Sequence, residues 1–350
     1  MNLLSKYRTE LYGFSILWIM IFHGNAICHV DYFHRFPALA FLDRAIAWGN
    51  IGVEVFILLA GISAYYSFSK DPNILSFYKK RAKRLYFPVL IICWPYWIWQ
   101  LLSGAIGIKQ FFLDILLVKF WVTGDQQIWF VSTIAMLYLL YPVIHLFFEK
   151  KNYWTDGHDG DSSVGIARMS KAIELLAVIL ALIFLMYKCV PEYYKLVEIG
   201  LNRIPIFIMG VWLGPLVKNN TDIDPGSILY LLLITLFGIY LLWIRESKGI
   251  YRRWHYELMG TPLTILLSFG MQKAGRYIRL FFSFFGRMSL ELYLAHIIAI
   301  RLNRAGFFFP YVEGAAKNYI VLLCIAVLAA WAAFVIESFL KRIPERKQHK

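Results

Sequence analysis

Charged residues are scarce in this chain. Asp, Glu, Lys and Arg together make up 17% of its 350 residues, and the 22 acidic residues are outnumbered by 36 basic ones. Cysteine is also rare, and each of the four cysteines is isolated in or beside an apolar stretch, which indicates free thiols rather than a disulfide framework or a metal site. The sequence lacks a Gly-x4-Gly-Lys phosphate loop and a His-Glu-x2-His zinc motif, so it indicates neither a P-loop nucleotidase nor a zinc peptidase. The cysteines are Cys28, Cys93, Cys189 and Cys324.

Apolar residues, by contrast, are abundant. They form 59% of the chain, 18% of the residues are aromatic, and the mean hydropathy is +0.57. They gather in blocks of about 17–22 residues, close to the roughly 20 that an α-helix needs to cross a bilayer core. We therefore predict an all-α, polytopic transmembrane helix bundle of about ten spans, with a short re-entrant or interfacial segment at 110–118. The expected spans lie near 11–30, 48–68, 86–107, 128–148, 172–189, 204–217, 228–244, 257–272, 286–303 and 318–339.

Lys and Arg are distributed unevenly between the loops that connect these spans. With the N-terminus in the cytoplasm, the larger share of them falls in cytoplasmic loops, although the basic group at 245–253 falls on the opposite side. We therefore predict a multi-pass protein of the inner (cytoplasmic) membrane with both termini in the cytoplasm. The chain, 1–350, is predicted to be one domain that contacts membrane lipid, ends in a basic tail at 340–350 and binds no nucleic acid.

A histidine near the end of the first span is the first candidate catalytic residue. His23 lies in LWIMIFHGN, and Glu54 lies in NIGVEVFILLAG at the start of the second span. Adjacent antiparallel helices would bring the two to a similar depth, where a carboxylate could fix the imidazole tautomer and leave the other ring nitrogen as a base. Ionisable groups inside a membrane are costly and usually have a partner. We favour a catalytic His23–Glu54 pair over a buried polar pair that only joins two helices.

A basic cluster in FYKKRAKRLYFPVL precedes the third span. Arg81 and Arg84 are three residues apart and share a helical face, with lysines around them. Their guanidinium groups could clamp the phosphates of a cytosolic ligand. Such clusters also act as orientation signals and headgroup anchors, and spacing alone does not separate the two interpretations.

Two further segments place polar residues inside spans. GRMSLELYLAH carries Glu291, Tyr293 and His296, which indicate a polar path through the bundle. QIWFVSTIAMLYLLYP carries Trp129, which an interfacial aromatic belt would also supply. These four residues are further candidates for the site.

Six segments in order resemble the acyltransferase 3 family of integral-membrane acyltransferases over nearly the whole chain. They are LYGFSILWIMIFH, which ends at His23; IGVEVFILLAG, with Glu54 where members carry Asp or Glu; FYKKRAKRLYFPVL; IWFVSTIAMLYLLYP; RIPIFIMGVWLG; and GRMSLELYLAH. The resemblance implies an O-acyltransferase whose donor is an acyl-CoA, expected to be acetyl-CoA. The donor would bind from the cytoplasm against Arg81 and Arg84. It further implies that His23 activates a hydroxyl of a surface glycan or of its lipid-linked precursor, or relays the acyl group. No metal is expected.

One position departs from the family pattern. Members commonly carry an Arg eleven residues before the first-span histidine, where this sequence has Tyr12. Arg8 and Glu10, at the start of the same span, are the charged candidates nearest to that end of the helix. Arg8 could reach into the region that the missing Arg would occupy.

Two other functions are compatible with intramembrane ionisable residues. One is a transporter of a small anion or sugar derivative, although the two halves of the sequence show no internal symmetry. The other is a non-catalytic component of a polysaccharide-assembly complex, which would bind no acyl donor.

Overall fold

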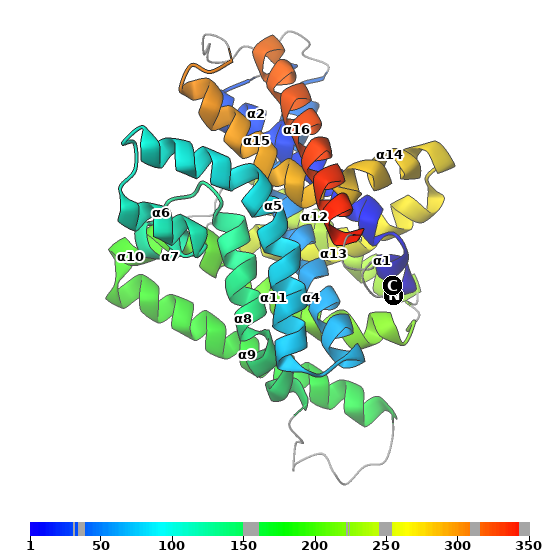
Figure 1. Cartoon of the computed structure of the whole chain (residues 1–350). Helices are drawn as coiled ribbons and strands as arrows, with labels where there is room; N and C mark the ends of the chain where they lie inside the picture. Colours follow the sequence, from blue (N-terminus) through cyan, green and yellow to red (C-terminus); the bar gives the residue numbers. More distant parts are fainter. Residues whose placement is uncertain are drawn as a thin grey trace, which may run out of the picture.

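The structure, a computed structural model, describes residues 1–30, 32–33, 39–149, 161–221, 223, 225–244, 254–308 and 316–342. These residues form α-helices and a short 3₁₀ helix but no strand, so the predicted all-α class is confirmed (Figure 1). The helices are α1 Asn2–Lys6, α2 Arg8–Cys28, α3 Ala40–Ala47, η2 Gly49–Ile51, α4 Gly52–Lys70, α5 Ile74–Leu102, α6 Ile108–Ile115, α7 Lys119–Thr123, α8 Trp129–Glu149, α9 Asp161–Cys189, α10 Pro191–Leu201, α11 Ile204–Lys218, α12 Pro225–Ile244, α13 Trp254–Lys273, α14 Arg276–Arg287, α15 Ser289–Arg304 and α16 Ala316–Arg342.

Seven of the described helical segments are long and apolar enough to cross a membrane. They are Arg8–Cys28, Phe41–Lys70, Ile74–Leu102, Trp129–Glu149, Arg168–Cys189, Pro191–Lys218 and Lys317–Leu340. Helices α12, α13 and α15 occupy the other three expected spans. A polytopic helix bundle is therefore confirmed, and the total of ten spans stays a prediction.

Several connecting segments are more ordered than the sequence suggested. Helix α6 covers most of the expected short piece at 110–118, and its eight residues extend only about 12 Å, too little to cross. The connection expected at 273–285 contains α14, whose arginines and phenylalanines alternate at helical spacing. Helix α9 begins at Asp161, earlier than expected. Residues 343–350 of the predicted basic tail lie outside the described residues.

Close glycine contacts fix the helices that carry the candidate residues. Helices α4 and α11 meet at Gly61 and Gly210, where a Cβ atom on Gly61 would come within 2.4 Å of a main-chain oxygen of α11. Helices α2 and α14 meet in the same way at Gly13 and Gly286. Small residues let helices approach this closely in a membrane, and each contact fixes the register of one helix against its neighbour.

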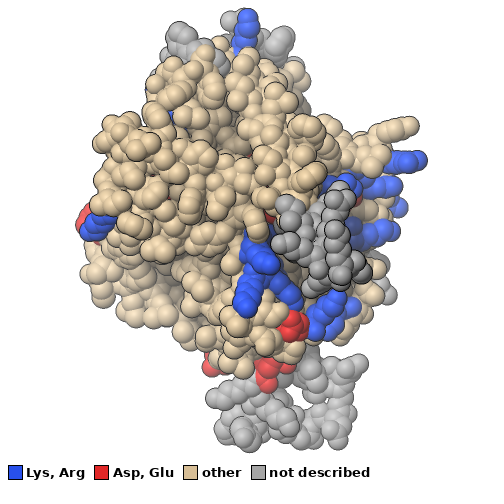
Figure 2. All heavy atoms as spheres, in the orientation of Figure 1, with Lys and Arg blue, Asp and Glu red and all other residues tan. Residues whose placement is uncertain are grey.

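The face of the bundle seen in Figure 2 is largely uncharged. Figure 2 shows a broad face without charged side chains, with Lys and Arg gathered near the start of α5 and beside α14. Large apolar side chains on α12 and α16 are exposed, among them Phe237 and Phe339, as a lipid-facing surface requires. We call the end of the bundle around His23 and the segment 103–128 the histidine end. The end around residues 79–84 is the basic end.

Candidate active site

His23 pairs with a second histidine. It lies near the C-terminal end of α2, and its Nδ1 is 2.7 Å from Nε2 of His296 on α15. The two rings are stacked, with centroids 5.0 Å apart. His296 is 1% exposed, whereas His23 is half-buried and borders a cavity. The expectation that Glu54 is the partner of His23 is therefore wrong.

The hydrogen bonds of His296 define the tautomer of His23. Nδ1 of His296 is 2.8 Å from the carbonyl oxygen of Leu292, and a carbonyl can only accept, so this nitrogen carries the proton. Nε2 of neutral His296 is then an acceptor, and Nδ1 of His23 must donate to it. Nε2 of His23 is left with its lone pair. The hydrogen bond that fixes the ring of His23 therefore comes from His296 rather than from a carboxylate.

Glu54 lies deeper in the bundle and pairs with an arginine. It is 0% exposed, and its Oε1 is 3.2 Å from Nη2 of Arg203 at the start of α11, which is also fully buried. The register of α2 against α4 explains the difference in depth. Gly52 packs against Ile19, so Glu54, still further along α4, lies closer to the middle of α2 than His23 does.

Arg203 is a site residue that the sequence reasoning missed. Its guanidinium also donates to the Ile199 carbonyl at 2.8 Å and to Asn50 Oδ1 at 3.3 Å, and it lies 4.9 Å from the ring centroid of Trp129. Asn50 and Trp129 both border the cavity at His23, so the buried ion pair supports one of its walls. The signal was present, because Arg203 opens the apolar segment RIPIFIMGVWLG and an intramembrane charge indicates a partner.

The cavity at the histidine end has a volume of about 650 Å³, enough for a small organic molecule or a sugar. Its wall combines aromatic and aliphatic side chains with amides and cations. The residues that line it are Ile19, Phe22, His23, Ala26, Ile27, Asn50, Val53, Tyr96, Gln126, Gln127, Trp129, Ile199, Tyr256, Tyr293, Ile297, Ile300, Arg301 and Arg304. Three predicted candidates, His23, Trp129 and Tyr293, therefore meet at one cavity, and His296 lies directly behind it.

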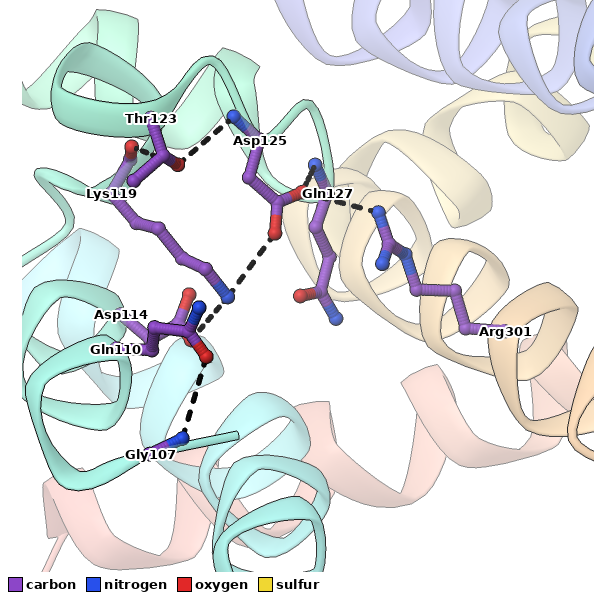
Figure 3. Close-up of polar contacts among 8 residues, drawn as sticks. All are labelled: Gly107, Gln110, Asp114, Lys119, Thr123, Asp125, Gln127 and Arg301. Atoms are coloured by element: carbon purple, nitrogen blue, oxygen red, sulfur yellow. Dashed lines mark hydrogen bonds and ion pairs between the residues drawn. The ribbon is translucent and has the colours of Figure 1, made fainter. Parts of the chain in front are cut away.

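A chain of ion pairs braces the rim of this cavity (Figure 3). Lys119 of α7 lies 2.8 Å from Asp114 of α6 and 3.1 Å from Asp125. Asp125 in turn lies 3.3 Å from Nη2 of Arg301 on α15. The segment 103–128 is thus tied to the helix that carries His296.

The two carboxyl groups of this chain have opposite pKa shifts. Burial raises the pKa of Asp114 above its ordinary value, and the nearby Lys119 offsets this only in part. Burial also acts to raise the pKa of Asp125, but the charges of Lys119 and Arg301 outweigh it and lower that pKa. Asp125 is therefore the firmly ionised member that joins the two cations.

The arginine pair at the basic end separates into two environments. Arg81 is 6% exposed, donates to the hydroxyl and carbonyl oxygens of Ser63, and lies 4.7 Å from the ring centroid of Tyr138. Arg84 is exposed. The burial of Arg81 contradicts the expectation that both guanidinium groups are open to one ligand: its Nη1 and Nη2 donate to Ser63, and its Nε is buried without a partner among the described residues.

The remaining candidates lie at the basic end. Tyr12 is buried and stacked on Phe56 at 5.0 Å, and it borders a crevice of about 50 Å³ together with Arg84. Glu291 is buried near the start of α15, within electrostatic range of Arg84. Arg84 thus occupies the region where the family pattern places a first-span cation.

Arg8 and Glu10 are half-buried at the start of α2, at the opposite end of this helix from His23. They do not reach the cavity in which His23 lies. Among the described residues, no cluster of His, Cys, Asp and Glu has the geometry of a metal site.

The family comparison matches residues 12–337 to the acyltransferase 3 family, which is described as an acyltransferase domain. The match covers nearly the whole chain, so the chain belongs to this family and is a membrane acyltransferase. The searches of curated proteins and of solved structures found no match to it.

Proposed function

We propose that this protein is an O-acyltransferase that transfers an acyl group from acyl-CoA to a hydroxyl of a surface glycan or of its lipid-linked precursor. We expect the acyl group to be acetyl. The observation that carries the proposal is the hydrogen-bonded His23–His296 pair at the wall of the cavity. A base with a defined tautomer beside a cavity of sugar size is the arrangement that hydroxyl activation requires.

The reaction needs one base and one acid in turn, and His23 can supply both. Its Nε2 takes the proton of the acceptor hydroxyl as the oxygen attacks the thioester carbonyl. The imidazolium that forms is stabilised by the neutral Nε2 of His296, which accepts the Nδ1 proton as a hydrogen bond. When the C–S bond breaks, His23 returns the proton to the sulfur of coenzyme A, so protons and bonds balance.

The donor is proposed to enter from the basic end, which we place in the cytoplasm on the distribution of Lys and Arg. Arg84 and the exposed Lys79 and Lys83 are the groups proposed to contact the phosphates of coenzyme A. Arg81 is instead proposed to hold α5 in place. The histidine end would then face the extracytoplasmic side, where the acceptor binds.

The test is acylation of surface polysaccharide, measured by mass spectrometry in cells that express each variant. His23→Ala should reduce acylation by a factor of about 10²–10⁴, the usual contribution of a positioned base. His296→Leu should lower it by about 10-fold or more, because Nδ1 of His23 loses its acceptor, and His296→Gln should recover part of it.

The matched control is His145→Gln. His145 is a half-buried histidine of α8 at the basic end that contacts Tyr141 and does not border the cavity. Its replacement should leave acylation unchanged. Unchanged acylation in a correctly inserted His23→Ala protein would overturn the proposal.

A further inference from the structure

The polar lining of the cavity is biased towards hydrogen-bond donors and positive charge. Besides His23, it carries two arginines, Arg301 and Arg304, and three side-chain amides. No Asp or Glu is among the described residues that border it. Asp125, the carboxylate that pairs with Arg301, is not among the lining residues and also pairs with Lys119.

Gln127 presents a buried donor without a partner. The residue is 2% exposed and borders the cavity, and its Nε2 has no hydrogen-bond partner among the described residues. Its main chain is held in place, because its N–H donates to Asp125 Oδ1 at 2.9 Å. Buried side-chain amides are nearly always hydrogen-bonded, so an unpaired N–H at a cavity wall marks where a ligand acceptor atom belongs.

Arg301 presents a cation at the same wall. Its side chain is 39% exposed, and its ion pair with Asp125 is a single 3.3 Å contact from Nη2. A guanidinium has five N–H donors in a fixed fork, so donors are left to face a ligand. Figure 3 shows the side chains of Gln127 and Arg301 close together below Asp125, and both line the cavity.

The cavity itself relates this cation to the base. Arg301 and His23 border the same space of about 650 Å³, although they lie on different helices. An anion on Arg301 and a hydroxyl that contacts His23 can therefore belong to one small acceptor molecule. Neither group would need to leave the cavity.

We propose that the cavity selects an acceptor that carries a negative charge, a carboxylate or a phosphate, on the same molecule as the hydroxyl to be acylated. Arg301 binds the anion, and Gln127 donates to an oxygen of the same acceptor. The assignment of these groups to an acceptor, rather than to another ligand, depends on the proposed function.

The test is equilibrium binding to purified His23→Ala protein in a non-ionic detergent, where no acyl transfer can consume the ligand. Glucose, glucuronate and glucose 6-phosphate are titrated separately, so that a carboxylate and a phosphate are compared with the same neutral sugar. At least one of the two anions should bind about tenfold more tightly than glucose, as one charge-assisted contact at a partly exposed site allows.

Three variants in the same background test the residues. Arg301→Gln should abolish the preference for the anion, and Arg301→Lys should retain part of it. Gln127→Glu should weaken anion binding more than glucose binding, because it places a carboxylate beside Arg301. Lys109→Gln is the matched control, since it removes one exposed cation from α6 at the same end of the bundle and should leave the preference intact.

Two results would overturn the inference. One is equal or undetectable binding of both anions relative to glucose in the folded protein, and the other is an anion preference that persists in Arg301→Gln. The proposed function fails separately, through the acylation assay, because a charge preference measured in His23→Ala does not depend on catalysis.

Discussion

The two ends of the bundle hold their charges in different ways. At the histidine end, charges are joined in chains: Asp114, Lys119, Asp125 and Arg301 form one, and Glu54 with Arg203 forms a buried pair behind the cavity wall. At the basic end, Lys79 and Lys83 are exposed and form no ion pair with any described residue, and Arg84 is exposed as well.

The difference separates charges that hold structure from charges that are available to ligands. A paired, buried charge fixes the helices that carry it, because its removal leaves an uncompensated partner. An exposed cation in a cluster contributes little to stability and can bind an anion. The two arginines of the Arg-x2-Arg motif also differ, since Arg81 is buried against Ser63 and Tyr138 whereas Arg84 is exposed.

The buried Glu54–Arg203 pair should give the largest effect when it is broken. Both side chains are 0% exposed, so Glu54→Gln leaves a guanidinium in the interior without its counter-charge and should cost about 3–5 kcal/mol of stability. Thermal unfolding in detergent measures the loss. The double variant Glu54→Gln/Arg203→Met removes both charges and should recover much of it.

The same pair tells whether Glu54 has a role beyond structure. If the double variant regains both stability and acylation, Glu54 acts only through Arg203 and the wall of the cavity. A double variant that is stable but inactive would restore Glu54 as a catalytic candidate. Glu54→Gln with wild-type stability would contradict the description of the pair as structural.

The two arginines of the motif should respond differently to the same substitution. Arg84→Gln should weaken acetyl-CoA binding by about tenfold and lower thermal stability less than Arg81→Gln does, because the residue is exposed. Arg81→Gln should instead lower stability by about 1–3 kcal/mol, because Ser63 and the Tyr138 ring lose a buried partner. Isothermal titration and thermal unfolding of both proteins measure the two effects.

Arg→Lys replacements sharpen this contrast. Lys at position 84 keeps a charge for phosphate and should recover part of the donor affinity, whereas Lys at position 81 cannot reproduce the fork on Ser63. Loss of donor binding in a stable Arg81→Gln protein would mean that Arg81 also contacts the ligand.

Much of the helix arrangement could be predicted from the sequence, because each apolar block of about 20 residues defines one helix by itself. His23 could be singled out for the same local reason. Its partner could not, because His296 lies on a helix near the other end of the chain, and only packing decides which faces meet. The error over Glu54 has the same origin, since a shift of a few residues in the register of α2 against α4 replaces one partner by another.

The smallest expected effect lies in the ion-pair chain at the rim, where Asp114 and Asp125 share Lys119. The pKa of Asp125 is lowered, so its contribution to stability is present above the ordinary Asp pKa and is lost as the pH falls through the lower, folded-state value. The pKa of Asp114 is raised, so folding disfavours its ionised form and its contribution to stability becomes less unfavourable as the pH falls.

Asp125→Asn should therefore lower the unfolding temperature at pH 7 by about 2 °C, a difference that closes below about pH 4. Asp114→Asn should cost less at pH 7, and its difference from wild type should move in the opposite direction on acidification. The measurement is the unfolding temperature of wild type and of both variants between about pH 3 and pH 7. If the two variants differ from wild type in the same way at every pH, Lys119 does not distinguish the two carboxylates.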